Sequence, residues 1–212
     1  MTGEQLVEHF AAATIPTRYG DFTAHAYRSH GDGEEHVAYT MGDLVSAAAP
    51  LVRVHSECLT GDILASERCD CGYQVQAALW MIAEEGVGAL VYLRGHEGRG
   101  IGIAHKIRAY SLQDEDGLDT VDANTAQGLP VDSRDYRVGA LILNDLGVTS
   151  MRLMTNNPTK HRALEAFGLT VVERVALEIE STPDRAHYLA TKRDRMGHLM
   201  SSKTATDGAA PS

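Results

Sequence analysis

The chain contains three cysteines, Cys58, Cys69 and Cys71, and all of them fall within the run HSECLTGDILASERCDCG. Thiolates are good zinc ligands, and Cys69 and Cys71, separated by one residue, can bring two sulfur atoms to one ion. Structural zinc sites fill all four positions with protein ligands, whereas catalytic sites leave one position to water. Three cysteines therefore predict one zinc ion held by three thiolates and a water, and they favour chemistry over a structural role.

Two alternatives for the cysteines stay open. The first is three unrelated buried cysteines, because free cysteine is among the most buried residue types; the clustering of all three argues against it. The second is a structural zinc site completed by His55 or His96. Glu57 and Glu97 are the acidic residues nearest to these motifs in the sequence, where a proton carrier could act, although a surface position is the default for glutamate.

Two further segments are typical of phosphate binding. RGHEGRGIG places glycines around Arg94, Glu97 and Arg99 between a buried strand and a helix, where backbone N–H groups can face an anion. In MTNNPTK, Thr155 ends a strand and Lys160 lies in the first helical turn, where a cation is disfavoured unless an anion is near. Candidate phosphate-binding cations are Arg53, Arg94, Arg99, Lys106, Arg108, Arg134 and Lys160.

Composition limits the class of partner. The formal net charge is -10, which makes a nucleic-acid polymer a poor partner, since such binding draws on clustered positive charge. The N-terminal run MTGEQLVEHF has no basic start, and no apolar stretch approaches the length of a membrane span. An odd number of cysteines argues for thiols that are reduced or metal-bound. We therefore expect a cytoplasmic protein that contacts no membrane.

The pattern along the chain predicts strands that alternate with helices. Residues 1–50 suggest a short helix followed by strands at 21–28 and 34–41. Further strands are expected at 51–55, 88–95, 150–155 and 169–177, and helices at 72–86, 101–113, 135–147 and 157–168, with a polar loop over 116–134. This predicts an α+β (mixed α/β) fold: a central mixed sheet with βα units packed by helices and a short β-rich N-terminal part.

The motifs RVHSECLTGD, RCDCG, HEGRGIG, KIRAYSLQD, DTVDAN and TNNPTK, in this order and spacing, resemble GTP cyclohydrolase II. The resemblance implies hydrolysis of GTP that opens the imidazole ring at C8, releases formate and pyrophosphate, and leaves a diaminopyrimidinone ribosyl phosphate as the first step of riboflavin biosynthesis. It also implies zinc, magnesium with the triphosphate, and a homodimer. We expect residues 1–200 to form a single catalytic domain without a fused butanone-phosphate synthase domain, and 201–212 to be a disordered tail.

The resemblance also implies roles for individual residues. Zinc would be held by Cys58, Cys69 and Cys71, and GTP contacted by Arg53, Val54, His55, Ser56, Glu57, Gln74, Glu97, Gly98, Arg99, Thr120, Thr155 and Lys160. Tyr110 would assist ring opening, and Asp132 would accept a proton. Arg134 would attack the α-phosphorus or, because a guanidinium with a pKa above about 12 stays protonated, stabilise charge there while water attacks. From the residues alone, Asp132 caps a helix or pairs with an arginine, and Tyr110 is a packing residue.

Two alternative functions remain at this point. One is a nucleotide-binding sensor with structural zinc and no hydrolysis, which predicts a fourth protein ligand on the metal. The other is a related cyclohydrolase that stops at the formamide.

Overall fold

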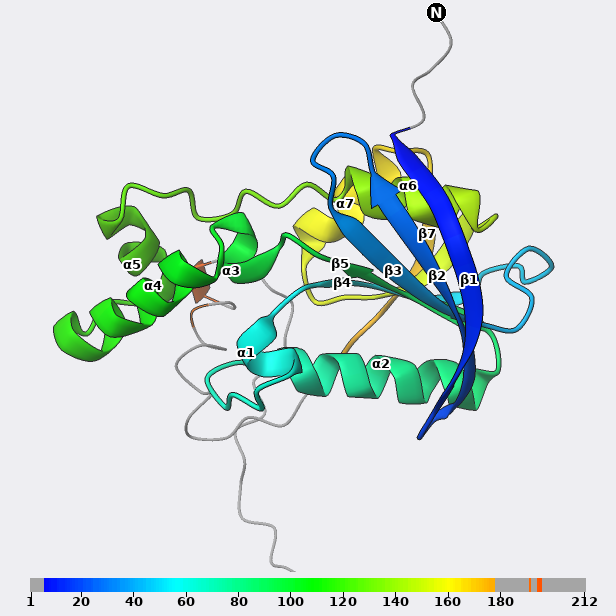
Figure 1. The fold of residues 1–212 in the computed structure, drawn as a ribbon, viewed down its shortest axis with the longest axis horizontal. Helices are drawn as coiled ribbons and strands as arrows, with labels where there is room; N and C mark the ends of the chain where they lie inside the picture. The colour runs from blue at the N-terminus through cyan, green and yellow to red at the C-terminus, as the bar shows by residue number, and fades with distance from the viewer. Residues whose placement is uncertain (1–5, 178–190, 192–193, 196–212) are drawn as a thin grey trace, which may run out of the picture.

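The computed structural model describes residues 6–177, 191 and 194–195. Its core is a seven-stranded mixed sheet with the strand order β1-β2-β3-β5-β4-β6-β7 (Figure 1). The first four strands in this order pair antiparallel, and β5, β4, β6 and β7 pair parallel. The predicted mixed sheet with helices and a β-rich N-terminal part is therefore confirmed.

The N-terminal part consists of strands alone in the described residues. It contains β1 (Val7–Thr17), β2 (Gly20–Ser29) and β3 (Glu35–Met41). The prediction of a short helix before these strands is wrong for the described residues, because this segment forms the strand β1. A tight turn, in which the Thr17 hydroxyl donates to the Gly20 carbonyl oxygen, sets the register with β2. Pairing with β2 thus overrides the local pattern, whose alanine run is compatible with either structure.

The parallel part carries the buried strands. These are β4 (Leu51–Ser56), β5 (Gly88–Leu93), β6 (Ser150–Met154) and β7 (Thr170–Val175). β4 and β5 are almost wholly buried, as expected for strands covered on both faces. The first four residues of the β4 sequence LVRVHS alternate between the two faces, so Val52 and Val54 enter one core cluster and Leu51 enters the other.

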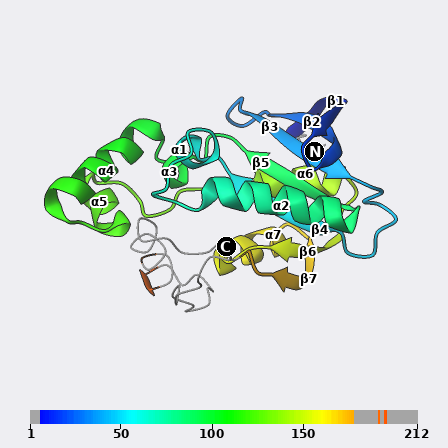
Figure 2. The same ribbon diagram turned by 90° about the horizontal axis from the view of Figure 1, so that it is seen from below.

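Helices cover both faces of this part (Figures 1 and 2). α2 (Cys71–Glu85) packs Ala78 and Ile82 onto one face, and it ends at Gly86, whose φ is +74°. α6 (Arg137–Asp145) and α7 (Pro158–Glu165) cover the other face. The predicted helix starting on a proline is confirmed, with Pro158 following the Asn157 cap.

A small helical lobe extends beyond one end of the sheet (Figures 1 and 2). It holds the short turns α1 (Leu59–Asp62) and α3 (Glu97–Gly100), then α4 (Ile103–Asp116) and α5 (Thr120–Ala126). The polar loop expected over 116–134 is thus partly wrong, since α5 lies within it. The Asp119 carboxylate caps α5 by accepting from the Val121 and Asp122 backbone N–H groups.

The predicted tail, 201–212, lies outside the described residues, and the single-domain boundary at 200 stays a prediction. No helix among the described residues is long and apolar enough to cross a bilayer.

Candidate active site

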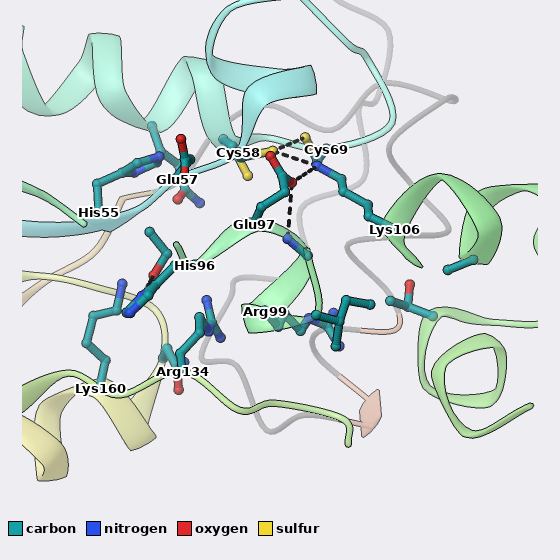
Figure 3. A pocket seen from close by; sticks show the side chains of 18 of the residues that line it. His55, Glu57, Cys58, Cys69, His96, Glu97, Arg99, Lys106, Arg134 and Lys160 are labelled. Carbon is teal, nitrogen blue, oxygen red and sulfur yellow. Dashed lines mark hydrogen bonds and ion pairs between the residues drawn. The ribbon is translucent and has the colours of Figure 1, made fainter. Parts of the chain in front are cut away.

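A cavity lies at the carboxyl ends of β4, β5 and β6, between the sheet and the helical lobe (Figure 3). The loops that follow these strands begin at Glu57, Arg94 and Thr155 and carry most of the motifs identified in the sequence. Ligand sites in α/β folds favour this edge of a parallel sheet. The cavity is lined by Arg53, His55, Ser56, Glu57, Cys58, Cys69, Cys71, Gln74, His96, Glu97, Gly98, Arg99, Ile101, Lys106, Ala109, Tyr110, Gln113, Thr120, Asn124, Arg134, Thr155, Asn156, Asn157 and Lys160.

The three cysteines come together on one side of the cavity. Their sulfur atoms all lie within 4.8 Å of one another, and Cys58 Sγ is 3.7 Å from Cys69 Sγ. Hydrogen bonds from Cys69 and Cys71 and the nearby Lys106 hold the pKa of Cys58 far below that of an ordinary thiol, whereas the bond to Cys58 raises the pKa of Cys69 to about 11. The cluster therefore holds an anionic sulfur and can bind a metal.

Glycine at position 61 is required by this close approach. A β-carbon on Gly61 would lie 2.6 Å from Cys69 Sγ and 3.2 Å from Cys58 Sγ. Any larger residue would push the sulfur atoms apart, so the loop between the cysteines is shaped around their meeting point.

Asp62 fixes the strand end that carries Cys58. Its buried carboxylate accepts from the Cys58 backbone N–H at 2.9 Å and from the Tyr92 hydroxyl at 2.8 Å, and it pairs with His55 Nε2 at 3.1 Å. Burial lowers the pKa of His55, so the ring is neutral at pH 7. Neither His55 nor His96 belongs to the sulfur cluster, and His96 instead contacts the Ser56 hydroxyl at 3.3 Å.

Lys106 and Glu97 form a buried ion pair beside the cluster. The ammonium nitrogen lies 2.7 Å from Glu97 Oε1 and donates to Cys58 Sγ at 3.1 Å (Figure 3). Tyr110, one helical turn further along α4, lines the cavity on this side, with the Lys106 ammonium 5.8 Å from its ring centre. Burial raises the pKa of Tyr110, which keeps its hydroxyl protonated.

The opposite side of the cavity is cationic (Figure 3). Arg134 and Lys160 both lie over the ring of Tyr136, at 5.5 and 5.0 Å from its centre. Lys160 Nζ also donates to the Val54 carbonyl oxygen at 2.7 Å. Burial, together with these two cations, lowers the pKa of His96 to about 4. His96 is therefore neutral at pH 7, mainly because it is buried and also because Arg134 and Lys160 are near.

Arg99 is held in a costly conformation. Its backbone φ is +68°, in the left-handed region that non-glycine residues rarely adopt. The residue is only 9% exposed, yet both terminal guanidinium nitrogens are buried without a hydrogen-bond partner. Buried donors are normally paired, and strained residues cluster at functional sites. The geometry therefore fits a residue that binds an anion.

Arg53 and Gln74 form the floor of the cavity. Arg53 donates to the Met154 carbonyl oxygen at 2.9 Å and to Gln74 Oε1 at 2.5 Å, and Gln74 in turn donates to Asp70 at 2.6 Å. Burial lowers the pKa of Arg53, an effect that Asp70 opposes. These hydrogen bonds tie the middle of β4 and the carboxyl end of β6 to the first turn of α2.

The cavity brings together the predicted site residues with two exceptions. Val54 does not line it, because its side chain packs in the core on the far face of β4 and its carbonyl oxygen accepts from Lys160. Asp132 also lies outside the lining and instead binds Arg134, with Oδ1 2.9 Å from Nε. That pairing holds the pKa of Asp132 below its usual range although burial acts to raise it.

Sequence reasoning gave Lys106 only as one of many cations and missed Asp62, Asn124 and Asn157. A signal for Lys106 was present, because Lys106 and Tyr110 are four residues apart and share one face of α4. Asp62 has no comparable signal, since two of its partners, His55 and Tyr92, come from separate strands.

Residues 8–176 match the family model described as GTP cyclohydrolase II. The chain belongs to the GTP cyclohydrolase II family. It is 59% identical over 197 residues to the riboflavin biosynthesis protein RibBA of Salinispora tropica, covering 93% of this chain and 49% of that protein. The RibBA of Aquifex aeolicus is 59% identical over 196 residues, covering 92% of this chain and 48% of the relative.

A plant relative is the "Bifunctional riboflavin biosynthesis protein RIBA 1, chloroplastic" of Arabidopsis thaliana. It is 55% identical over 204 residues, and the match covers 96% of this chain and 37% of that protein. The chain thus spans about half the length or less of these curated relatives. Among solved structures, RibBX, a two-domain 3,4-dihydroxy-2-butanone 4-phosphate synthase from A. baumannii, matches with a TM-score of 0.51 and 28% identity over 83% of this chain and 42% of that one.

Proposed function

We propose that this member of the GTP cyclohydrolase II family hydrolyses GTP, opening the guanine ring at C8 with release of formate and pyrophosphate. This reaction is the first step of riboflavin biosynthesis. The observation that carries the proposal is a single cavity with a three-thiolate cluster on one side and a cationic wall on the other. Such a cavity suits a ligand with a reactive base at one end and phosphates at the other.

The donor set suits zinc. Three sulfur atoms within 4.8 Å of one another are soft ligands of the kind that select zinc, and Gly61 leaves room for their approach. When bound by Cys58, Cys69 and Cys71, zinc would supply Lewis acidity and an activated water for attack at C8. No other group of three possible His, Cys, Asp or Glu ligands occurs in the described part of the chain. A structural zinc would need a fourth protein ligand, and no further His, Cys, Asp or Glu of the described residues joins the three cysteines.

The cationic side would hold the triphosphate. Both terminal nitrogens of Arg99 are unpaired, and a planar guanidinium suits bidentate binding of an anion such as a phosphate. Lys160 adds a point charge in the first turn of α7. Arg134, oriented by Asp132, would face the α-phosphate and either attack it or stabilise its charge. Asp132 would accept the proton that this step releases, since its low pKa leaves it ionised.

Tyr110 and Glu97 would act on the base. The raised pKa of Tyr110 keeps a proton on the hydroxyl, which can donate to the ring as it opens. Glu97, Gln74 and Ser56 line the same region and offer hydrogen-bond partners to a guanine edge. Thr120 and Thr155 line the cavity and would complete the nucleotide contacts.

Magnesium, the homodimer and the cytoplasmic location remain part of the proposal. Magnesium prefers oxygen ligands and would be carried mainly by the triphosphate. The high identity to the RibBA proteins supports a place in riboflavin biosynthesis.

Incubation of the purified protein with GTP, zinc and magnesium tests the proposal. We expect formate and pyrophosphate in equal amounts, and a diaminopyrimidinone product by mass spectrometry. Binding of GTP with neither product would overturn the proposal in favour of a nucleotide sensor. Accumulation of a formamide would instead indicate a cyclohydrolase that stops early.

A further inference from the structure

Lys106 occupies a position that the proposed reaction does not explain. Its ammonium nitrogen donates to Cys58 Sγ at 3.1 Å, to Thr60 Oγ1 at 2.7 Å and to Glu97 Oε1 at 2.7 Å. An ammonium has three N–H donors, so these contacts use all of them. The residue is 8% exposed, and its contacts therefore form in a region with little water.

The surrounding chain fixes this ammonium in place. Glu97 Oε2 accepts from the Leu59 backbone N–H at 2.6 Å, so one carboxylate binds both Lys106 and the residue after Cys58. Gly98 leaves space for the lysine stem, because a β-carbon there would lie 3.1 Å from the Lys106 Cβ. The N–H donor is thus pre-oriented toward one particular sulfur.

Three thiolates on a divalent ion leave a net negative charge, which weakens the ion as a Lewis acid. A hydrogen bond from a cation to a ligating sulfur withdraws electron density from it, and such outer contacts tune metal sites. We propose that Lys106 is a positioning residue that tunes the metal of the cysteine cluster through its N–H···S bond to Cys58. This inference rests on the proposed function insofar as the cluster holds a metal.

Cobalt(II) in place of zinc makes the effect visible, because its sulfur-to-metal charge-transfer bands report the electron density on the thiolates. In Lys106→Met the bands should move to longer wavelength, because the Cys58 sulfur regains the electron density that the N–H···S bond withdraws. The matched control is Arg108→Met, which removes one positive charge from the exposed side of the same helix, where the Arg108 guanidinium donates to the Ser111 hydroxyl. It should leave the bands in place. An unchanged band position in Lys106→Met overturns the proposal.

Loss of the ammonium also leaves the Glu97 carboxylate without its buried partner, which can prevent folding. The double variant Lys106→Met with Glu97→Gln removes that charge and should show the same shift to longer wavelength. Lys106→Arg keeps N–H donors and should restore the bands toward their original position. A parent protein that releases formate and pyrophosphate while Lys106→Met shows no band shift overturns only the role of Lys106. If the parent protein releases neither product but Lys106→Met shows the expected band shift, only the proposed reaction is overturned.

Discussion

The two sides of the cavity differ in how far their charges are already matched. On the thiolate side, Lys106 binds Glu97 and Cys58, and Asp62 binds His55, Tyr92 and the Cys58 backbone. On the cationic side, Arg99 has two buried nitrogens without a partner. On the first side the charges of Lys106 and Asp62 are paired, although His55 Nδ1 has no hydrogen-bond partner, whereas on the second side both terminal nitrogens of Arg99 lack one. On the proposed function, the protein alone would order the metal ligands, whereas the phosphates of the nucleotide would supply the partners that Arg99 lacks.

Both sides also contain a non-glycine residue with a left-handed backbone. Ala65, in the loop between Cys58 and Cys69, has a φ of +53° and lies outside the cavity lining, whereas Arg99, with a φ of +68°, lines the cavity. A strained residue at a ligand site costs free energy that ligand contacts offset. Variants on the two sides should therefore fail in different ways.

The largest effect is expected from Cys58→Ser on the thiolate side. It should remove stoichiometric metal and lower formate release by at least about 10⁴-fold, because the Lewis acid contributes several kcal/mol to the barrier. Pyrophosphate release should persist, since the cationic side is untouched. Metal analysis and parallel assays of the two products check this. Normal formate release by a metal-free variant would contradict the division between the two sides.

Arg134→Lys should act on the opposite step. It keeps the charge but loses the planar fork that pairs with Asp132, so pyrophosphate release should fall by about two to three orders of magnitude. Arg137→Lys is the matched control, because Arg137 pairs with Asp135 in the same two-residue spacing but does not line the cavity. Metal content should be unchanged in both. Equal losses in the two variants would refute a specific role for Arg134.

Arg99→Gly should separate stability from binding. Glycine relieves the left-handed strain and removes an unpaired guanidinium, so the free energy of unfolding without nucleotide should rise by about 1 kcal/mol. The KM for GTP should rise about tenfold or more. Ala65→Gly is the control, since Ala65 is the other described non-glycine residue with positive φ, at +53°, and lies outside the cavity lining. Ala65→Gly should raise the free energy of unfolding without changing the KM for GTP. A destabilised Arg99→Gly would mean that Arg99 is a structural residue.

The smallest effect concerns His96 and pH. Its pKa falls from 6.5 to about 4 in the folded protein, so the unfolded chain binds more protons between these values. His96 therefore makes the free energy of unfolding fall as the pH drops from about 6.5 to about 4. Above pH 6.5 it has little effect on that free energy. His96→Asn should lose part of this decrease, measured as the difference in free energy of unfolding between pH 7.5 and 5. An identical pH dependence would show that the pKa of His96 is not lowered in the folded protein.

The sequence predicted much of this molecule because its strongest signals are local. Gly86 and Pro158 mark helix boundaries by backbone chemistry that tertiary contacts do not change. The strand β1 was missed because its alanine-rich sequence is also compatible with a helix, and pairing with β2 across a tight turn makes it a strand. Val54 was assigned to the ligand because it lies within a contiguous motif, although alternation along β4 turns its side chain into the core. Asp62 could not be found, since its partners meet only in the folded chain.

The most direct test of the central claim is a structure of the zinc-loaded protein with a non-hydrolysable GTP analogue and magnesium. We predict that C8 of the guanine faces the metal held by Cys58, Cys69 and Cys71, and that the triphosphate contacts Arg99, Arg134 and Lys160. Phosphates bound against the cysteine cluster, or a fourth protein ligand on the zinc, would contradict it.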